Sequence, residues 1–467
     1  MKGEEILMND FTMKIPTFKE LEQIFFSLLS NIFVEEFVDY LHMMDEKIME
    51  LRDKNRYRLK DHRERTIQTL FGEVTFQRRL YEDRTTGQTV YLLDQYLSME
   101  KRKPMSPYLE EWAIRLAAEG TSYRKAANFL EEWFGKPVLS HETIRQKLIE
   151  RGMSFQEEAP IKEESKPKAD VLFIEVDGIH TSIQQSKRKS KEHRIALVHQ
   201  GWKKRGDRYE LQNKQYYRHE GTGDFWEGFG EFILEHYDVD EKTWWIVSGD
   251  GAEWIKACEN YFRNVIFVID RFHLARELKE HLKDHPEAYQ QAREAFLAYD
   301  GEKIIQIVEH LTVEHTDRRA KQKWERFVTY IQNNAKYHRD YRNLLKALGK
   351  ETSTYQPMGG SEATMRLFAR RIKSGGYSWS IPGVESMIQV LISLKTTGRI
   401  PGERGTRIDD IKQIEQNRKA HAKERISRSV QKIKEMGKGA VQGVLPYLAH
   451  TSRTHPMHQA LRGLKGI

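Results

Sequence analysis

The chain has a single cysteine, Cys258, among its 467 residues. One thiol cannot form an internal disulfide and cannot build a cysteine-rich zinc site, so both are excluded. The sequence also has no apolar run long enough to span a bilayer and no pattern typical of a secretory signal peptide. We therefore expect a protein of the reducing cytoplasm that has no membrane partner.

What the sequence does contain is the composition of a large globular chain with a basic charge balance. Hydrophobic residues make up 39% of it, and its length predicts about three structural units at roughly 150 residues each. Lysine and arginine total 77 against 69 aspartates and glutamates, which gives a net charge of +8. This excess favours a polyanionic partner wherever the basic residues are clustered.

The apolar run Val-Leu-Phe-Ile-Glu-Val-Asp at 171–177, followed by Gly178, predicts a buried strand. A carboxylate at the end of such a strand can project from the edge of a sheet into a cleft. Asp177 is therefore a candidate metal ligand. The alternative is that Asp177 and Gly178 only begin a turn, because these two residue types dominate turns.

Residues 1–100 predict a helix and then a small antiparallel sheet. Apolar residues recur at spacings of three and four over 18–51, which indicates an amphipathic helix with a wide buried face for packing or dimerisation (segment 1–55). Period-two alternation on either side of Gly72 predicts a hairpin, and 90–93 predict a third strand (segment 56–100). Phosphate contacts and solvated strand faces both explain the arginines of this sheet, which are Arg63, Arg65, Arg78, Arg79 and Arg84.

Segment 101–156 predicts three short helices. The first begins after Ser106 and ends at Gly120, the second covers 122–134 and the third covers 141–151. Each has a serine at or just before its start, a residue type that caps helices by accepting a backbone hydrogen bond.

The third of these helices turns Ile144 and Leu148 inward and is basic on its outer face. This pattern is typical of a helix-turn-helix domain, whose last helix enters the DNA major groove. The alternative is a small helical bundle that binds no DNA. The predicted DNA-binding residues of the segment are Arg124, Lys125, His141, Thr143, Arg145 and Lys147.

After a charged linker at 157–168, strands and helices alternate. Three strands are followed by a helix, a strand, a helix, a strand and a further helix. Right-handed crossovers would place these strands in one mixed sheet with helices on both faces, which is the order of the ribonuclease-H-like fold. We therefore predict a multidomain α/β protein whose ribonuclease-H-like core, at 169–275 and 355–398, is interrupted by an inserted all-α domain at 276–354.

This fold would bring two aspartates to the same edge of the sheet. Asp177 ends the first strand and Asp250 follows the fourth, and these two strands are neighbours in the ribonuclease-H-like order. Two adjacent carboxylates repel each other unless a cation lies between them, and Mg²⁺ prefers oxygen ligands. A pair of such ions about 3.5–4 Å apart can activate an attacking oxygen and stabilise a leaving oxygen at phosphorus.

The chemistry needs a third carboxylate, for which Glu362 is the candidate. The loop at 357–361 ends in Ser361, a predicted helix cap, so that Glu362 falls in the first turn of the next helix. A glutamate there also has an ordinary explanation, because it complements the helix dipole.

Five short motifs lie at the predicted sheet edge and on either side of this helix: Asp177-Gly-Ile-His, Ser248-Gly-Asp-Gly-Ala, Asp270-Arg-Phe-His, Gly359-Gly-Ser-Glu and Gly375-Gly-Tyr-Ser-Trp-Ser. Together they resemble the ISLre-type family of bacterial insertion-sequence transposases, which are relatives of the Mutator-like elements. The resemblance covers most of the chain, and the order and spacing of the motifs carry it. It implies a DDE triad of Asp177, Asp250 and Glu362 that holds two Mg²⁺ or Mn²⁺ ions.

The resemblance also bears on residues near the triad. Asp270 and His273 occupy the place where such relatives carry a Cys-x-x-His or similar pair, and we expect them to surround the metal ligands. Trp379 would either stack on an unpaired base or pack in the core. Residues 399–467 are charge-dense and basic, so they predict a helical region that extends the DNA footprint.

Three arginines follow Glu362 on the same predicted helix. Arg366 and Arg370 lie on nearly the same side and Arg371 is adjacent, so they would hold phosphates beside the metals. A solvated helix face is the alternative explanation.

We therefore predict a DNA transposase that binds the terminal inverted repeats of an insertion sequence, cuts a strand and joins the freed 3′-hydroxyl to target DNA. A nuclease of the same fold would cut without joining, and a transposase-derived DNA-binding protein would bind without chemistry. Paired ends imply a homodimer or higher oligomer, and the bacterial cytoplasm with its nucleoid is the expected location.

Overall fold

The structure is a computed structural model that describes residues 17–154, 166–185, 189–221, 223–311, 317–373 and 375–402, without the side chains of 360–364. These residues form a mixed α/β protein with a three-stranded sheet, a six-stranded mixed sheet and many helices. Most of the predicted linker at 157–168, and the predicted basic region from 403 onward, lie outside the described residues.

The N-terminal helix α2 (Phe18–Leu51) has the bounds that its apolar periodicity predicts. Its second half packs on the hairpin through Val34, Val38 and Leu41. In the first half, the large apolar side chains are not covered by the described residues of the chain, so packing within the chain does not bury them. Dimerisation through this face stays a prediction.

The hairpin of β1 (Tyr57–Thr69) and β2 (Gly72–Asp83) is confirmed and is longer than predicted. The third strand predicted at 90–93 is wrong in most of its length. Strand β3 (Thr89–Val90) has only two residues, and the apolar residues after it form the short buried helix α3 (Leu92–Tyr96). Periodicity cannot distinguish a strand from a buried helical turn in so short an apolar run.

Three arginines of this sheet form internal ion pairs. Arg65 and Arg78 both pair with Asp94, and Arg79 lies 2.7 Å from the Asp45 carboxylate of α2. The pairs tie the hairpin to the helices beside it, so these arginines do not fit the phosphate contacts considered from the sequence.

The helices α4 (Pro107–Glu119), α5 (Tyr123–Phe134) and α6 (His141–Ser154) lie where the sequence predicts them. Ser106 and Ser122 cap the first two by accepting a backbone N–H. Buried Leu109, Leu130 and Leu148 hold the three helices together in one core.

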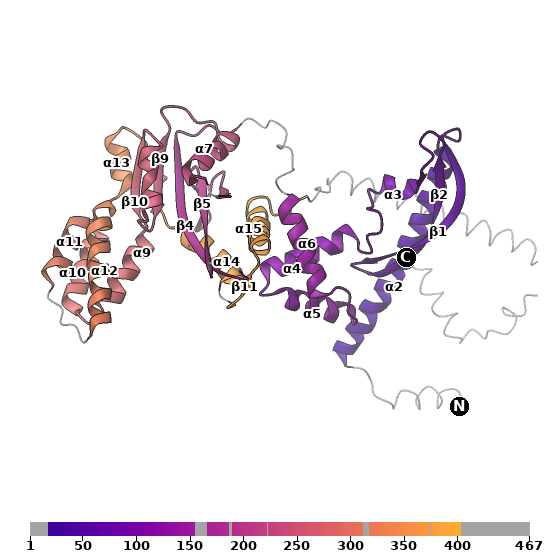
Figure 1. Ribbon diagram of the computed structural model, residues 1–467, viewed down its shortest axis with the longest axis horizontal. Helices are drawn as coiled ribbons and strands as arrows, with labels where there is room; N and C mark the ends of the chain where they lie inside the picture. Colours follow the sequence, from indigo (N-terminus) through magenta and orange to yellow (C-terminus); the bar gives the residue numbers. More distant parts are fainter. Residues whose placement is uncertain are drawn as a thin grey trace, which may run out of the picture. The chain divides into compact units, whose positions relative to one another are not determined.

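The main sheet has the strand order β10-β9-β4-β5-β8, and Figure 1 shows β4, β5, β9 and β10 side by side. Strands β4 and β5 are antiparallel, as are β5 and β8, whereas β9 and β10 run parallel to β4. The strands are β4 (Val171–Ile183), β5 (Ser190–His199), β8 (Gln215–Arg218), β9 (Trp244–Gly249) and β10 (Val265–Ile269). The predicted succession of strands is confirmed.

Helices cover both faces of this sheet. Helix α7 (Phe225–His236) packs on one face against side chains such as Ile174 and Val198. On the other face, α14 (Gly360–Ile372) and α15 (Ile381–Thr396) pack against side chains such as Ile179 and Ile195. The short strand β11 (Ser378–Trp379) joins the sheet beside β4.

Two local predictions in this region are wrong. The second strand, predicted to continue to Trp202, ends at His199, and an additional hairpin follows from β6 (Trp202–Arg205) and β7 (Arg208–Leu211). The helix predicted at 254–262 is instead α8 (Glu253–Lys256) and a 3-10 helix at Ala257–Asn260.

The inserted region is helical, as predicted. It contains α9 (Arg271–Leu282), α10 (Pro286–Leu297), α11 (Gly301–His310), α12 (Arg318–Asn334), a 3-10 helix (Ala335–Tyr337) and α13 (Tyr341–Ala347). Its own apolar core includes Leu278, Ala292, Ile304 and Phe327. Among the described residues, no helix is both long enough and apolar enough to cross a membrane.

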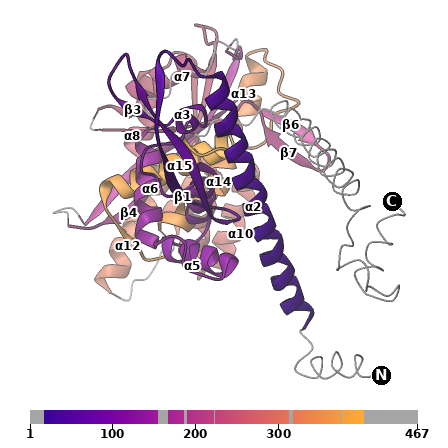
Figure 2. The same cartoon turned by 90° about the vertical axis from the view of Figure 1, so that its right-hand side faces the viewer.

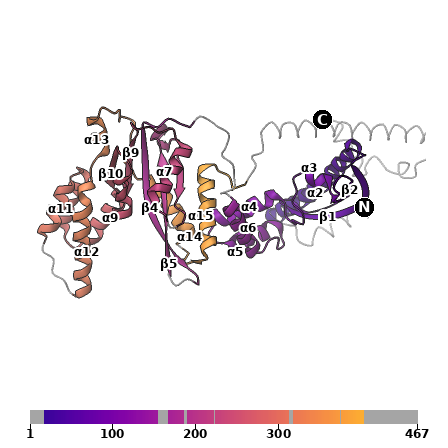
Figure 3. The ribbon, with the colours of Figure 1, turned by 45° about the horizontal axis from the view of Figure 1, so that its top comes forward.

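Helix α15 lies between the sheet and the helices α4 and α6 in Figures 1 and 3. A Cβ atom on Gly152 of α6 would lie only 2.4 Å from the Cβ of Ser386 on α15, and the Ser386 hydroxyl donates a hydrogen bond to the Ile149 carbonyl. The absence of a side chain at Gly152 therefore permits this close packing. The helices α4, α5 and α6 therefore share one apolar core with the sheet.

Candidate active site

The ends of two neighbouring parallel strands bring Asp177 and Asp250 together. The register pairs Glu175 of β4 with Ser248 of β9, so each aspartate lies two residues beyond this pair. Because the strands are parallel, both aspartates reach the same edge of the sheet.

Asp270 adds a third carboxylate to the row. Ile269, the last residue of β10, pairs with Gly249 of β9, so Asp270 follows at the level of Asp250. The Asp270 carboxylate caps α9 by accepting hydrogen bonds from the backbone N–H groups of Phe272 (2.7 Å) and His273 (3.3 Å). The Nδ1 atom of His273 lies 3.9 Å from Asp270 Oδ2.

Local hydrogen bonds orient the other two aspartates. Asp177 Oδ1 accepts from the backbone N–H of Gly178 at 2.7 Å, and Asp250 Oδ1 accepts from that of Ala252 at 2.9 Å. Gly251, between Asp250 and Ala252, has a φ of +92°, a conformation that glycine adopts readily. The strand therefore turns sharply after Asp250.

The electrostatics of Asp177 reflect this row of acids. Burial raises the pKa of its carboxyl, and the charges of Asp250 and Asp270 raise the pKa further, whereas His273 and the Gly178 N–H act in the opposite direction. A carboxylate whose charge is disfavoured in this way is stabilised by a bound cation. The oxygen-only donors of the two strand ends fit Mg²⁺ or Mn²⁺.

The third predicted ligand lies on α14. This helix begins at Gly360 and its N-cap is Gly359 without a side-chain cap, so the predicted cap at Ser361 is wrong. Glu362 is in the first turn, as predicted, but its side chain lies outside the described residues. Among the side chains that the structure does describe, no three of His, Cys, Asp or Glu are placed to hold a metal ion together.

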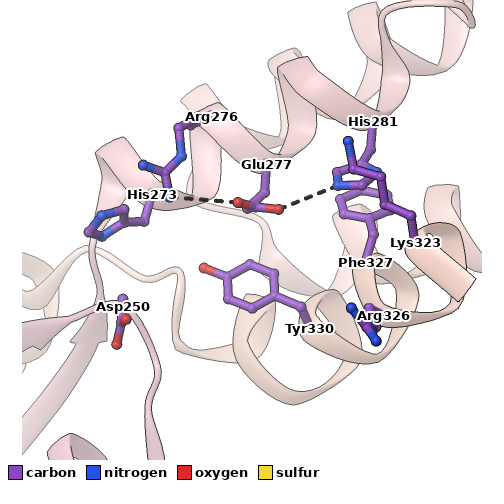
Figure 4. A pocket seen from close by; sticks show the side chains of 9 residues that line it. All are labelled: Asp250, His273, Arg276, Glu277, His281, Lys323, Arg326, Phe327 and Tyr330. Atoms are coloured by element: carbon purple, nitrogen blue, oxygen red, sulfur yellow. Dashed lines mark ion pairs between the residues drawn. The ribbon is translucent and has the colours of Figure 1, made fainter. Parts of the chain in front are cut away.

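A cavity of about 370 Å³ adjoins Asp250 and extends along the inserted helices α9 and α12. Figure 4 shows Tyr330 of α12 between Asp250 and Glu277, with His273 and Arg276 on the helix opposite. The cavity is lined by Asp250, His273, Arg276, Glu277, His281, Lys323, Arg326, Phe327 and Tyr330.

Tyr330 has an unusual environment in this cavity. Its hydroxyl is buried and has no hydrogen-bond partner among the described residues. Burial raises the pKa of the phenol, and the negative charge of Asp250 adds to the effect, so the group stays protonated and remains a donor. A ligand oxygen in the cavity would satisfy it.

Sequence reasoning missed this cavity. The available signal was the spacing of Lys323, Arg326 and Tyr330 at i, i+3 and i+7, which places them on one face of α12. The sequence of the inserted region does not indicate which face of α12 meets the sheet, because that depends on packing between segments far apart in sequence.

The predicted DNA-binding residues of α5 and α6 differ in their surroundings. Arg145 forms an ion pair with Glu142 at 2.6 Å and Lys147 forms one with Glu150 at 2.7 Å, so acidic neighbours offset both charges. Thr143 is half-buried and contacts Ser140. The exposed members of the set are Arg124, Lys125 and His141.

Replacing Arg124 and Lys125 by alanine should therefore weaken DNA binding more than replacing Arg145 and Lys147. Each lost phosphate contact should reduce the slope of log K against log salt by about 0.9. Fluorescence anisotropy with a DNA duplex at several salt concentrations measures this, with the exposed Arg205→Ala variant of the β6–β7 hairpin as the control. An unchanged slope would remove α5 from the DNA interface.

The predicted site residues of α14 and β11 divide into exposed and buried ones. Arg366 and Arg370 are exposed. Arg371 is buried and donates from Nε to the Ala117 carbonyl at 2.7 Å, so its predicted phosphate contact is wrong. Trp379 is buried and donates from Nε1 to the Ile372 carbonyl at 2.9 Å, which is the core position rather than one for base stacking.

Comparison with known protein families gives a match over most of the chain. The model of the Uncharacterised protein family (UPF0236) matches residues 12–407. The chain belongs to this family.

Relatives within UPF0236 match along most of their length. The UPF0236 protein in vanSb 3′region of Streptococcus gallolyticus is 27% identical over 390 residues, which cover 81% of this chain and 83% of the relative. A UPF0236 protein of Caldanaerobacter subterraneus subsp. tengcongensis is 23% identical over 430 residues, which cover 90% and 83%. The name of the latter carries eleven locus designations, and that of another relative from the same organism carries four.

Proposed function

We propose that this UPF0236 protein is a DDE transposase of the ISLre type, which binds the terminal inverted repeats of an insertion sequence and cuts and joins DNA strands. The observation that carries the proposal is the row of carboxylates at the ends of β4 and β9. Asp177 and Asp250 come from segments far apart in sequence, and the parallel register gives them the same level.

The strand order supports a ribonuclease-H-like core for this chemistry. Numbered by appearance, the five strands β4, β5, β8, β9 and β10 of the main sheet lie in the order 5-4-1-2-3. Neighbours among the first three are antiparallel, and the last two are parallel to the first. This is the arrangement that the proposed fold requires. The helical insertion after β10 and the return of the chain through α14 agree with the proposed division of the core into two parts.

The residues of the site have distinct roles in this proposal. Asp177, Asp250 and Glu362 would hold two Mg²⁺ or Mn²⁺ ions, which would supply the charge that activates the attacking oxygen and stabilises the leaving one. Asp270 holds His273 and the start of α9 in place beside them.

The cavity beside Asp250 would hold the DNA strand next to the scissile phosphate. Arg326 would bring positive charge to its wall and attract the phosphate backbone. Arg276 and Lys323 also lie there, although Glu277 at 3.7 Å and Glu280 at 2.6 Å partly offset their charges. Tyr330 would donate its hydrogen bond to a phosphate oxygen, because nothing else among the described residues accepts it.

The multiple loci of a relative also support transposition. Eleven locus designations belong to one UPF0236 protein of Caldanaerobacter subterraneus subsp. tengcongensis. Repeated copies of one gene in a genome are what the movement of an insertion sequence produces.

The proposal is tested with purified full-length protein and a plasmid that carries both flanks of its own gene. Mg²⁺ or Mn²⁺ should give cleavage at the element ends and joined products, and a chelator should abolish both. A plasmid with shuffled flanks is the control. Cleavage without joining would favour a nuclease, and binding without cleavage at either metal would favour a DNA-binding protein derived from a transposase.

A further inference from the structure

The first half of α2 carries an unusually large exposed apolar surface. Its large apolar side chains are 38–77% exposed, and they are Phe18, Leu21, Ile24, Phe25, Phe26, Leu28, Leu29, Ile32 and Phe33. A helix that is apolar on most sides is normally buried. Figure 2 shows α2 as one long helix whose first turns extend beyond the hairpin.

The exposed residues include a regular seam, which we define as Phe18, Leu21, Phe25, Leu28 and Ile32. They are spaced alternately by three and four residues, which is the pattern of a coiled-coil contact. At about 3.6 residues per turn, the seam lies on the side of α2 opposite the stripe that packs on the hairpin. The chain's own hairpin therefore cannot cover the seam.

One flank of the seam is partly occupied by other parts of the chain. Phe33 stacks on Phe71 of the hairpin turn with ring centroids 4.0 Å apart, and Phe26 meets Trp133 of α5 edge-on at 5.4 Å. Phe26 and Phe33 are seven residues apart, about two turns, so both contacts lie on the same side of α2 and leave the seam facing outward.

This half of the helix is also built to be ordered. Thr17 and Glu20 form a reciprocal capping box at its start, in which the Thr17 N–H donates to the Glu20 carboxylate at 2.6 Å. These turns continue directly into the half of α2 that packs on the hairpin, so the apolar surface is presented on a formed helix. The only charged residues between 18 and 33 are Lys19, Glu20 and Glu22.

We propose that the seam pairs with the seam of a second copy of the chain, so that two α2 helices form the core of a homodimer. Few charges oppose the approach of two identical surfaces, because the acidic residues of α2 concentrate in its second half, where they include Glu35, Glu36 and Asp39. A two-fold symmetric contact requires a self-complementary surface, and a three-four seam provides one.

The area of the seam is at the lower limit for a specific dimer. Its five side chains are about half exposed, which leaves on the order of 500 Å² of apolar surface on each helix at roughly 200 Å² for each large side chain. Covering this surface on both copies buries about 1,000 Å², the area that a specific protein interface needs to reach. This dimer does not depend on the proposed catalytic function.

The test is the molar mass of the full-length protein without DNA. We expect light scattering after gel filtration at micromolar concentration to give twice 55.2 kDa for the wild type. The double variant Phe25→Glu/Leu28→Glu should be monomeric, because four like charges would meet at the seam. The control Gln23→Glu/Asn31→Glu adds the same charge at exposed positions outside the seam and should stay dimeric.

A second variant tests whether the partner is another copy. Mixing the glutamate variant with Phe25→Lys/Leu28→Lys should restore a dimer, while each alone stays monomeric, and circular dichroism should show that each is folded. A monomeric wild type would overturn the proposal, as would a dimer that survives the glutamate substitutions. Cleavage assays do not enter either result, so a failure here is distinct from a failure of the proposed function.

Discussion

Replacing Asp250 by asparagine is expected to abolish metal-dependent cleavage and joining of DNA while leaving the binding of element ends unchanged. Asparagine keeps the size of the side chain and its hydrogen bond to the Ala252 N–H, but it removes the charge that a metal ion needs. We expect a loss on the order of 10³-fold or more, which corresponds to about 4 kcal/mol of barrier height. Single-turnover cleavage of a labelled end measures it.

The matched control is Glu253→Gln, three residues further along the chain. Glu253 is exposed and pairs with Lys256 at 2.6 Å, so its loss of charge should leave cleavage within about twofold of the wild type. Asp177→Asn should behave like Asp250→Asn, because the two carboxylates occupy one sheet edge. Wild-type activity in either aspartate variant would contradict the proposed metal site.

The strands that position these aspartates could be predicted because their sequences are distinctive. Apolar runs such as 171–176 and 265–269 have clear ends, and an aspartate follows each. The starts of α4 and α5 could also be predicted, because the capping residues Ser106 and Ser122 accept backbone hydrogen bonds there. The start at Gly359 was not, because a glycine N-cap has no side chain to identify it.

What the sequence could not show is which residues meet across long separations. Asp94 pairs with Arg65 and Arg78, yet it lies 29 residues beyond Arg65. In the sequence of the strands alone, these arginines therefore have the pattern of a solvated face. The periodicity of α2 predicts an apolar face in the same way, but it cannot say whether the same chain covers it. Tyr330 was missed for this reason too, because only the packing of the insertion places it beside Asp250.

The buried arginine of α14 leads to the second large effect. Replacing Arg371 by alanine is expected to lower the free energy of unfolding by roughly 2–4 kcal/mol, because it leaves a cavity and removes the hydrogen bond to the Ala117 carbonyl. The guanidinium also lies 5.1 Å from the ring centroids of both Tyr123 and Trp379, contacts that are strongest when shielded from water. Chemical unfolding followed by tryptophan fluorescence measures the change.

The neighbouring Arg370 provides the control that separates stability from DNA binding. It is exposed, so Arg370→Ala should change the free energy of unfolding by no more than about 0.5 kcal/mol. If it holds a phosphate near the metals, the same substitution should weaken DNA binding and lower its salt dependence. Arg371→Ala should lower the free energy of unfolding and leave the salt dependence of DNA binding unchanged. The reason is that its guanidinium joins α14 to α4 and thereby holds the helix that carries Glu362. Equal stability of the two variants would contradict this structural role for Arg371.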